Sequence, residues 1–333
     1  MATTVAKVWA RWMSVLLLLT PVAMASTAPS VTEAFNRFWQ SARGKPYVEQ
    51  VRLWDELIER PRAELYASVV WDSANHPDWR AQKARWLGAR FAAYADLAAA
   101  IPAQADALRA ALDQQQPRFR QWFPDASAHP PIVFVLAPNF DAKSGVLADG
   151  TPVLAFAVDS LLMEKARLDI VVPHELFHLY HAQHAGIRND GVMPAADLTL
   201  PLFEEGLATY VSGQLSAGHT DAELLLQDDL GDISTDRLAE MAGRFLADAC
   251  FKAIDPAHPE AYRRWFSTAA QRYQKDLPNR SGYWLGLQVI RQLRRDYSLA
   301  TIASWSPQAA QGHSFEALQL LSQHAESCRH SQP

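Results

Sequence analysis

Two short apolar runs stand out in a chain whose remaining sequence has mostly helical periodicity. They are "HPPIVFVLAP" (129–138) and "GTPVLAFAVD" (150–159). Both are rich in Val, Phe and Leu, and both are bounded by prolines or by the turn-forming "ADG", which is typical of β-strands. Because these are the best strand candidates in the chain, the predicted sheet is small and most of the core must be helical.

Helical spacing of Ala, Leu, Arg and Trp covers most of the remaining sequence. Residues 31–123 predict three or four helices, with breaks near Pro61, Pro77 and Pro102. After residue 160 the helical pattern returns and continues almost to the end. No internal repeat and no low-complexity linker divides the chain. We therefore expect an α+β fold that is mainly α with a small β-sheet.

The first 25 residues have the pattern of a secretory signal peptide. Lys7 and Arg11 precede the apolar run "VLLLLT", and the small-residue pattern "AMA" ends at Ala25. The apolar stretch is too short to span a bilayer comfortably and contains a proline. We expect cleavage after Ala25 and an exported protein, periplasmic or secreted, without a stable membrane anchor.

The charge of the chain gives no indication of a nucleic-acid partner. It has 31 basic and 36 acidic residues, and removal of residues 1–25 leaves 29 basic and 36 acidic residues, a formal charge of −7. The basic run "RQLRRDY" (291–297) is isolated and is typical of a solvated helix face.

The chain contains only two cysteines, Cys250 and Cys328. In an oxidising compartment such a pair can form one disulfide, and the alternative is two unpaired thiols. We expect the disulfide, which would tie the C-terminal tail to the helical body and contribute about 4 kcal/mol in the chain-entropy model.

The stretch "VVPHELFHLYHAQHAG" (171–186) carries the strongest chemical signal. His174 and His178 are four residues apart, which on a helix is about 40° past a full turn and a rise of about 6 Å. Both imidazoles therefore leave one face and can bind one ion. Glu175 lies about 100° round from His174, beside any water that the metal holds. His-Glu-x-x-His recurs in zinc hydrolases for this reason.

The local sequence agrees with a helix over this motif. Pro173 suits a first helical position, where its missing N–H needs no partner, and Gly186 suits the helix end.

A zinc site needs a third ligand, and the histidine stretch offers two candidates. His181 is seven residues from His174, about 10 Å along the axis, and is too far to share the ion. His184 has the spacing of the metzincin pattern, and Met193 could be its Met-turn residue. That pattern needs a glycine where this chain has His181, so His184 is the weaker candidate.

The segment "LFEEGLATYVSG" (202–213) offers the third candidate, with 26 residues between His178 and Glu205. Here the sequence resembles the gluzincins whose third ligand opens a Glu-Gly-x-Ala segment, including the aminopeptidase N group and poorly characterised families of predicted zinc proteases. The resemblance selects Glu205, directly before Gly206, as the ligand that joins His174 and His178. A zincin-like core is what the resemblance implies for the fold.

The same segment raises two further points. Adjacent Glu204 and Glu205 point about 100° apart on a helix, and such a pair at a helix N-terminus can also simply interact with the helix dipole. The small residues Gly206 and Ala208 let this helix approach the metal helix closely. The occurrence of both motifs in order favours a metal site.

Substrate-binding elements are also expected from the resemblance. Zincins lay an extended substrate along an edge strand before the metal helix, and residues 150–159 occupy that position. Similar families carry a tyrosine in a glycine-flanked helix after the third ligand, which indicates Tyr283 as the donor that stabilises the oxyanion, with Arg280 as a second donor. The alternative for Tyr283 is a core residue packed beside Trp284. Residues 150–159 lack the Gly-x-Met-Glu-Asn segment with which aminopeptidase N relatives bind a free amino terminus.

These patterns together predict an exported zinc metallopeptidase that acts on a peptide or protein substrate, with Glu175 activating a zinc-bound water. Residues 1–25 form the signal peptide, 26–128 a helical N-terminal region, and 129–333 a zincin-like catalytic region. The alternative is an exported helical binding or assembly protein in which the zinc site is structural or a relic.

Overall fold

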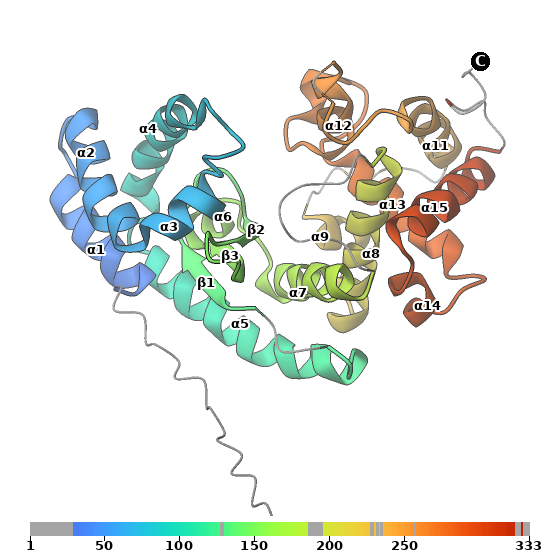
Figure 1. Ribbon diagram of the computed structural model, residues 1–333, viewed down its shortest axis with the longest axis horizontal. Coiled ribbons are helices and arrows are strands. Elements are labelled where there is room, and N and C mark those ends of the chain that lie inside the picture. Colours follow the sequence, from blue (N-terminus) through green and yellow to red (C-terminus); the bar gives the residue numbers. More distant parts are fainter. Residues whose placement is uncertain are drawn as a thin grey trace, which may run out of the picture.

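The computed structural model describes residues 29–126, 130–185, 196–226, 230, 233, 236–255, 257–323 and 328. The predicted signal peptide, Gly186 and Met193 lie outside these residues. Figure 1 shows two groups of elements, with the N-terminal helices and the strands on one side and the C-terminal helices on the other. The long helix α7 (Leu168–His184) lies between them.

The N-terminal group is helical, as expected, and short π-helical and 3₁₀ segments interrupt it around Pro61. Pro61 lies in a 3₁₀ turn, Pro77 lies before the fourth α-helix, and Pro102 lies in the first turn of the fifth. The elements are α1 (Val31–Ala42), α2 (Tyr47–Trp54), η1 (Asp55–Glu59), η2 (Arg60–Arg62), α3 (Ala63–Leu65), η3 (Tyr66–Val70), α4 (Trp79–Leu97) and α5 (Ile101–Trp122).

Three strands form one small sheet in the order β1-β3-β2. The two predicted strands are confirmed as β1 (Ile132–Val135) and β3 (Pro152–Ala157), which pair in parallel. The third strand, β2 (Ala142–Val146), pairs antiparallel to β3 and was not predicted, because "AKSGV" has little β-branched or aromatic content. The expectation that residues 150–159 form the edge strand is wrong, since β3 lies at the centre and β2 at the edge.

The free side of β2 presents unpaired backbone groups. The N–H of Ala157 donates to the carbonyl oxygen of Asp141 (2.8 Å), so hydrogen-bonded pairs with β3 fall on alternate residues, including Lys143. Ala142 and Ser144 therefore direct their N–H and C=O groups away from β3. Among the described residues, no backbone partner takes up these outward groups.

The helix that carries the histidine stretch starts earlier than expected. α6 (Val158–Met163) follows β3, and α7 then begins at Leu168, so Pro173 lies inside the helix and not at its first position. Proline cannot donate to the carbonyl oxygen four residues back, on Asp169. The Ser216 hydroxyl donates to that oxygen instead, which satisfies the carbonyl and allows the helix to continue through the proline.

The C-terminal group packs around α8 (Thr199–Leu215), the helix of the Glu-Gly-x-Ala segment. Gly206 lies against Gly286 of α13, where an added Cβ would lie 2.3 Å from the Gly286 carbonyl carbon. The close approach allowed by Gly206 is thus to α13, and the expectation that it faces the metal helix is wrong. The remaining elements are α9 (Asp221–Leu225), α11 (Asp236–Asp248), α12 (Pro259–Phe266), η4 (Ala270–Arg272), α13 (Ser281–Leu293), α14 (Leu299–Ala303) and α15 (Pro307–Leu321).

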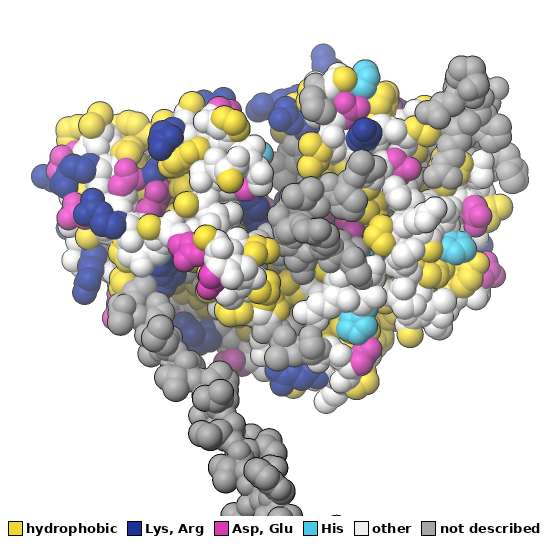
Figure 2. All heavy atoms as spheres, viewed as in Figure 1, with side chains coloured by type: hydrophobic (Ala, Val, Ile, Leu, Met, Phe, Trp, Pro, Cys, Tyr) yellow, Lys and Arg dark blue, Asp and Glu magenta, His cyan; other side chains and the backbone are white. Residues whose placement is uncertain are grey.

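The expected disulfide is confirmed, since Cys250 after α11 is bonded to Cys328 near the C-terminus. The fold is mainly α with a small mixed sheet, as predicted. Within the described residues, no helix is both long and apolar enough to cross a membrane. On the face drawn in Figure 2, basic and acidic side chains are interspersed over the N-terminal helices.

Candidate metal site

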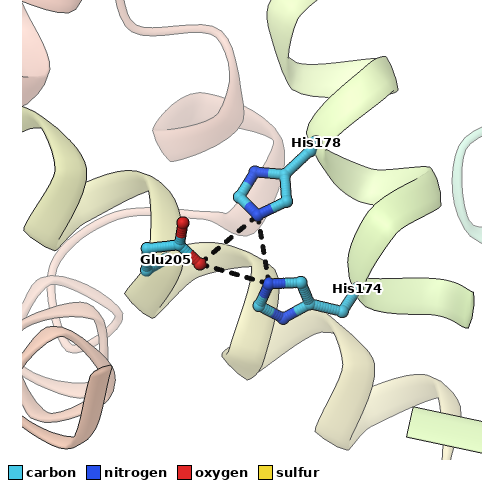
Figure 3. Close-up of side chains that lie close together, drawn as sticks. All are labelled: His174, His178 and Glu205. Atoms are coloured by element: carbon cyan, nitrogen blue, oxygen red, sulfur yellow. Dashed lines mark hydrogen bonds and ion pairs between the residues drawn. The ribbon is translucent and has the colours of Figure 1, made fainter. Parts of the chain in front are cut away.

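His174, His178 and Glu205 form a group that could hold a metal ion (Figure 3). The two histidines project from α7 toward Glu205 on the neighbouring helix α8, and the two helices pack against each other. Nε2 of His174 lies 3.0 Å from Nε2 of His178, and Oε2 of Glu205 lies 3.3 Å and 3.5 Å from these two atoms. The structure thus brings together the three residues that the sequence selected.

The burial of α7 explains why these side chains face one another. Between residues 170 and 182, only His174, Glu175 and His178 are not fully buried. Every other position packs into the core, including Leu176 and Phe177. The helix is therefore held on all other sides, and the motif occupies its one accessible face.

The corresponding part of α8 has the same character. Between residues 199 and 209, only Glu204 and Glu205 are not fully buried. A carboxylate surrounded by apolar core is costly unless it has a charged partner. The imidazoles of His174 and His178 are the partners of Glu205. This agrees with the resemblance, which selected Glu205 over Glu204.

The spacing of the donor atoms suits a small tetrahedral ion. Zinc binds histidine nitrogen and carboxylate oxygen at about 2.0–2.2 Å, and a tetrahedron of that size places neighbouring donors about 3.3–3.6 Å apart. The separations of 3.3 and 3.5 Å lie in this range, and the 3.0 Å between the two histidine nitrogens is slightly shorter. The residues present therefore fit zinc in both chemistry and spacing.

Burial and charge act in opposite directions on these groups. Burial raises the pKa of Glu205, but His178 and His174 outweigh it and hold that pKa well below its ordinary value. Burial lowers the pKa of His178, whereas the carboxylates around it, Glu205 first, raise the pKa to about 9. Glu205 thus stays ionised beside the imidazoles.

Glu175 lies beside the group but outside it. Among the described residues, its carboxylate has no hydrogen-bond or ion-pair partner. Burial raises the pKa of Glu175, and His174 and His178 act in the opposite direction. This carboxylate is free to accept a proton from a molecule in the cleft.

The other two histidines of the stretch are not part of the group. His181 is only 2% exposed and lies in the core beneath the metal-ligand group. Burial first, and then the neighbouring histidines, lower its pKa to about 3. Nδ1 of His184 faces the Tyr180 carbonyl oxygen at 2.9 Å, and its Nε2 lies 3.1 Å from Asp125. His184 is therefore occupied elsewhere, as the missing glycine predicts.

A cleft of about 900 Å³ opens over the metal-ligand group. The helices α7 and α8 form its floor, β2 with the preceding loop forms one wall, and α12 and α13 contribute to the other. Polar residues that line it outside the floor include Asp141, Lys143, Glu164, Tyr262, Arg280 and Tyr283.

Two tyrosines line the wall opposite the strand. Tyr283 was predicted, and it lies in the same cleft as the metal-ligand group. Burial, followed by the charge of Glu205, raises its pKa well above the ordinary value, so its hydroxyl keeps its proton. Sequence reasoning missed Tyr262, whose pKa burial and then Glu205 also raise. Nothing in "EAYRRWF" distinguishes this tyrosine from a core residue.

Glu164, at the rim of the cleft, predicts a pH dependence of stability. Burial first, and then the nearby Asp141 carboxylate, raise its pKa from the ordinary 4.5 to about 7. The folded protein therefore holds a proton there that the unfolded chain releases, so stability falls as pH rises from about 4.5 through about 7. We expect the free energy of unfolding of Glu164→Gln to decrease by about 1 kcal/mol less over this pH range than that of the unaltered protein. This value is smaller than the full pKa shift would give, because the carboxylate is partly exposed and water screens its charge.

Urea unfolding of both proteins at pH 5 and pH 8 measures this effect, since the difference between them cancels the other titrating groups. An equal loss of stability in both proteins would show that Glu164 does not titrate in this range.

Comparisons with protein-family models, with curated proteins and with solved structures found no match. The fold and the site together define a mainly α protein. In its open cleft lies a group of three residues that could hold a metal ion.

Proposed function

We propose that this protein is an exported zinc-dependent metallopeptidase with a zincin-like core, whose ion is held by His174, His178 and Glu205. The observation that carries the proposal is the convergence of three donor atoms from two helices, at the spacing of a tetrahedral ion, in an open cleft. The resemblance of the two motifs to gluzincins agrees with it. The proposal of export rests on the pattern of residues 1–25.

The chemistry follows from the groups around the ion. Bound zinc supplies Lewis-acid chemistry, which polarises a peptide carbonyl and makes water more acidic. Glu175 accepts the proton of the attacking water as the new C–O bond forms, and passes it to the leaving amine as the C–N bond breaks. Tyr283 donates a hydrogen bond to the carbonyl oxygen as that oxygen gains negative charge.

The edge of β2 provides a place for an extended peptide. Ala142, Lys143 and Ser144 line the cleft, and Ala142 and Ser144 direct unpaired backbone groups outward. A peptide that pairs with this edge gains backbone hydrogen bonds whatever its side chains are. The position of this edge beside the metal-ligand group supports a peptide substrate.

The alternative is a structural zinc in a binding or assembly protein. Structural zinc sites are closed by four protein ligands, whereas catalytic sites have three and keep one position open. In the part of the chain that the structure describes, the group has three members and lies in the cleft. This arrangement favours the enzyme.

Loss of one carboxylate is expected to remove the zinc. In Glu205→Ala the third donor disappears, so we expect the zinc content of protein purified without chelator to fall from about one ion per chain to near zero. The matched control is Glu204→Ala, which removes the adjacent carboxylate and should keep the ion. Atomic spectrometry measures the metal, and circular dichroism checks the fold.

The same assay separates the two types of third ligand. His184→Ala should keep the zinc, because that histidine is bonded to Asp125 and not directed at the group. Loss of zinc from His184→Ala with retention in Glu205→Ala would instead indicate a metzincin-type site. Absence of zinc from the unaltered protein would contradict the proposal, and digestion of a peptide library tests its hydrolytic part.

A further inference from the structure

One arginine joins the two walls of the cleft. Arg280 directly precedes α13, and its Nη2 atom lies 3.3 Å from Oδ2 of Asp141 and 3.8 Å from Oε2 of Glu164 on the other wall. Asp141 directly precedes β2, and Glu164 directly follows α6. The Arg280 side chain is only 16% exposed, so water screens these charges less than at the surface.

The backbone of Arg280 is held in an uncommon conformation. Its φ of 55° lies in the left-handed region, which is unfavourable for residues other than glycine. The Arg280 N–H donates to the Ser267 carbonyl oxygen (3.2 Å), and the Tyr283 N–H donates to the Arg280 carbonyl oxygen (2.9 Å). The surrounding structure thus maintains a turn that is costly for arginine, at a point where the side chain reaches across the cleft.

The same guanidinium lies over the ring of Tyr283. Its Cζ atom is 5.7 Å from the ring centroid, within the range of a cation–π contact. Arg280 therefore contacts both Tyr283, the proposed oxyanion donor, and Asp141, the residue that precedes β2.

Asp141 is anchored twice at the start of β2. Its carbonyl oxygen accepts from the Ala157 N–H of β3 (2.8 Å), and its carboxylate accepts from Arg280. The next residue, Ala142, is the first with outward backbone groups. Loss of the Arg280 contact would therefore change the position of the β2 backbone at the point where a peptide would pair with it.

We propose that Arg280 is a positioning residue that fastens the start of β2 to α13, so that the outward edge of β2 and Tyr283 hold an extended peptide at one spacing over the metal-ligand group. The role of the peptide rests on the proposed function, whereas the attachment of β2 does not. This role differs from the sequence expectation of a second oxyanion donor, because the guanidinium donates to the Asp141 carboxylate.

Hydrogen exchange tests the attachment without any substrate. In Arg280→Met, which keeps the aliphatic stem and loses the charge, we expect the amides of β2 that pair with β3 to exchange at least about tenfold faster, with β1 unchanged. The matched control is Arg291→Met on α13, whose ion pair with Asp221 (2.6 Å) lies outside the cleft. Unchanged exchange of β2 in Arg280→Met would overturn the proposal.

Peptide binding tests the consequence. With the inactive Glu175→Gln protein as background and its metal content unchanged, we expect Arg280→Met to raise the Kd of a labelled extended peptide by about tenfold. Asp141→Asn should also raise the Kd, and the double variant should lose no more than Arg280→Met alone, since Arg280→Met already removes the contact with Asp141.

The outcomes separate the two proposals. If the unaltered protein neither binds nor cuts peptides, the proposed function fails, and the exchange experiment still decides the attachment of β2. If Arg280→Met lowers kcat while peptide Kd and β2 exchange stay unchanged, Arg280 acts on the reacting group and the positioning role is wrong.

Discussion

Glu175→Gln is expected to lower peptidase activity by at least about 1000-fold while zinc content and fold stay unchanged. Glutamine has nearly the same size as glutamate, but it cannot accept the proton of the attacking water, and general bases contribute about 100- to 10,000-fold. Because the Glu175 carboxylate has no partner among the described residues, its replacement breaks no hydrogen bond or ion pair that supports the fold. The measurement is kcat on a peptide identified in the library digest, together with metal content.

The control for this change is Glu240→Gln on α11. Glu240 forms ion pairs with Arg237 and Arg244 on an exposed surface, and we expect activity within about twofold of the unaltered protein. Full activity in Glu175→Gln would contradict the proposed mechanism, even if the protein proved to bind zinc.

Gly206→Ala is expected to destabilise the fold by about 3 kcal/mol, at the upper end of typical overpacking costs. The added Cβ would lie 2.3 Å from the carbonyl carbon and 2.4 Å from the oxygen of Gly286. These atoms belong to the backbone of α13 and cannot rotate away, so the two helices must separate. Urea unfolding gives the free energy, and zinc content reports on the neighbouring Glu205.

The control is Gly312→Ala in α15, where no heavy atom lies within 4 Å of the added Cβ. There alanine should stabilise the helix by up to about 1 kcal/mol, because it restricts the unfolded chain more than glycine does. A neutral effect of Gly206→Ala would mean that α8 and α13 can move apart at little cost.

Much of the candidate site could be predicted because its geometry is local. The spacing of His174 and His178 places both on one face of any regular α-helix, whatever surrounds that helix. The same geometry excluded His181. Glu205 is different, since residue spacing alone left it beside Glu204, and only the resemblance distinguished them. Its convergence with the histidines depends on how α7 and α8 pack.

Several features could not be predicted because they depend on distant partners. The strand β2 has weak strand propensity and forms because β3 lies beside it. Pro173 lies inside a helix because Ser216, 43 positions later in the sequence, donates a hydrogen bond to the Asp169 carbonyl oxygen, to which a proline cannot donate. Tyr262 lines the cleft because α12 packs near α13.

The sequence by itself determined the mainly helical composition, the two longer strands and the pair of histidines, because each follows from backbone periodicity over a few residues. Only the tertiary structure decided that β3 is central and β2 an edge strand, that Gly206 faces α13 and that Arg280 reaches Asp141, 139 residues away. Such contacts depend on packing between elements that no local pattern records.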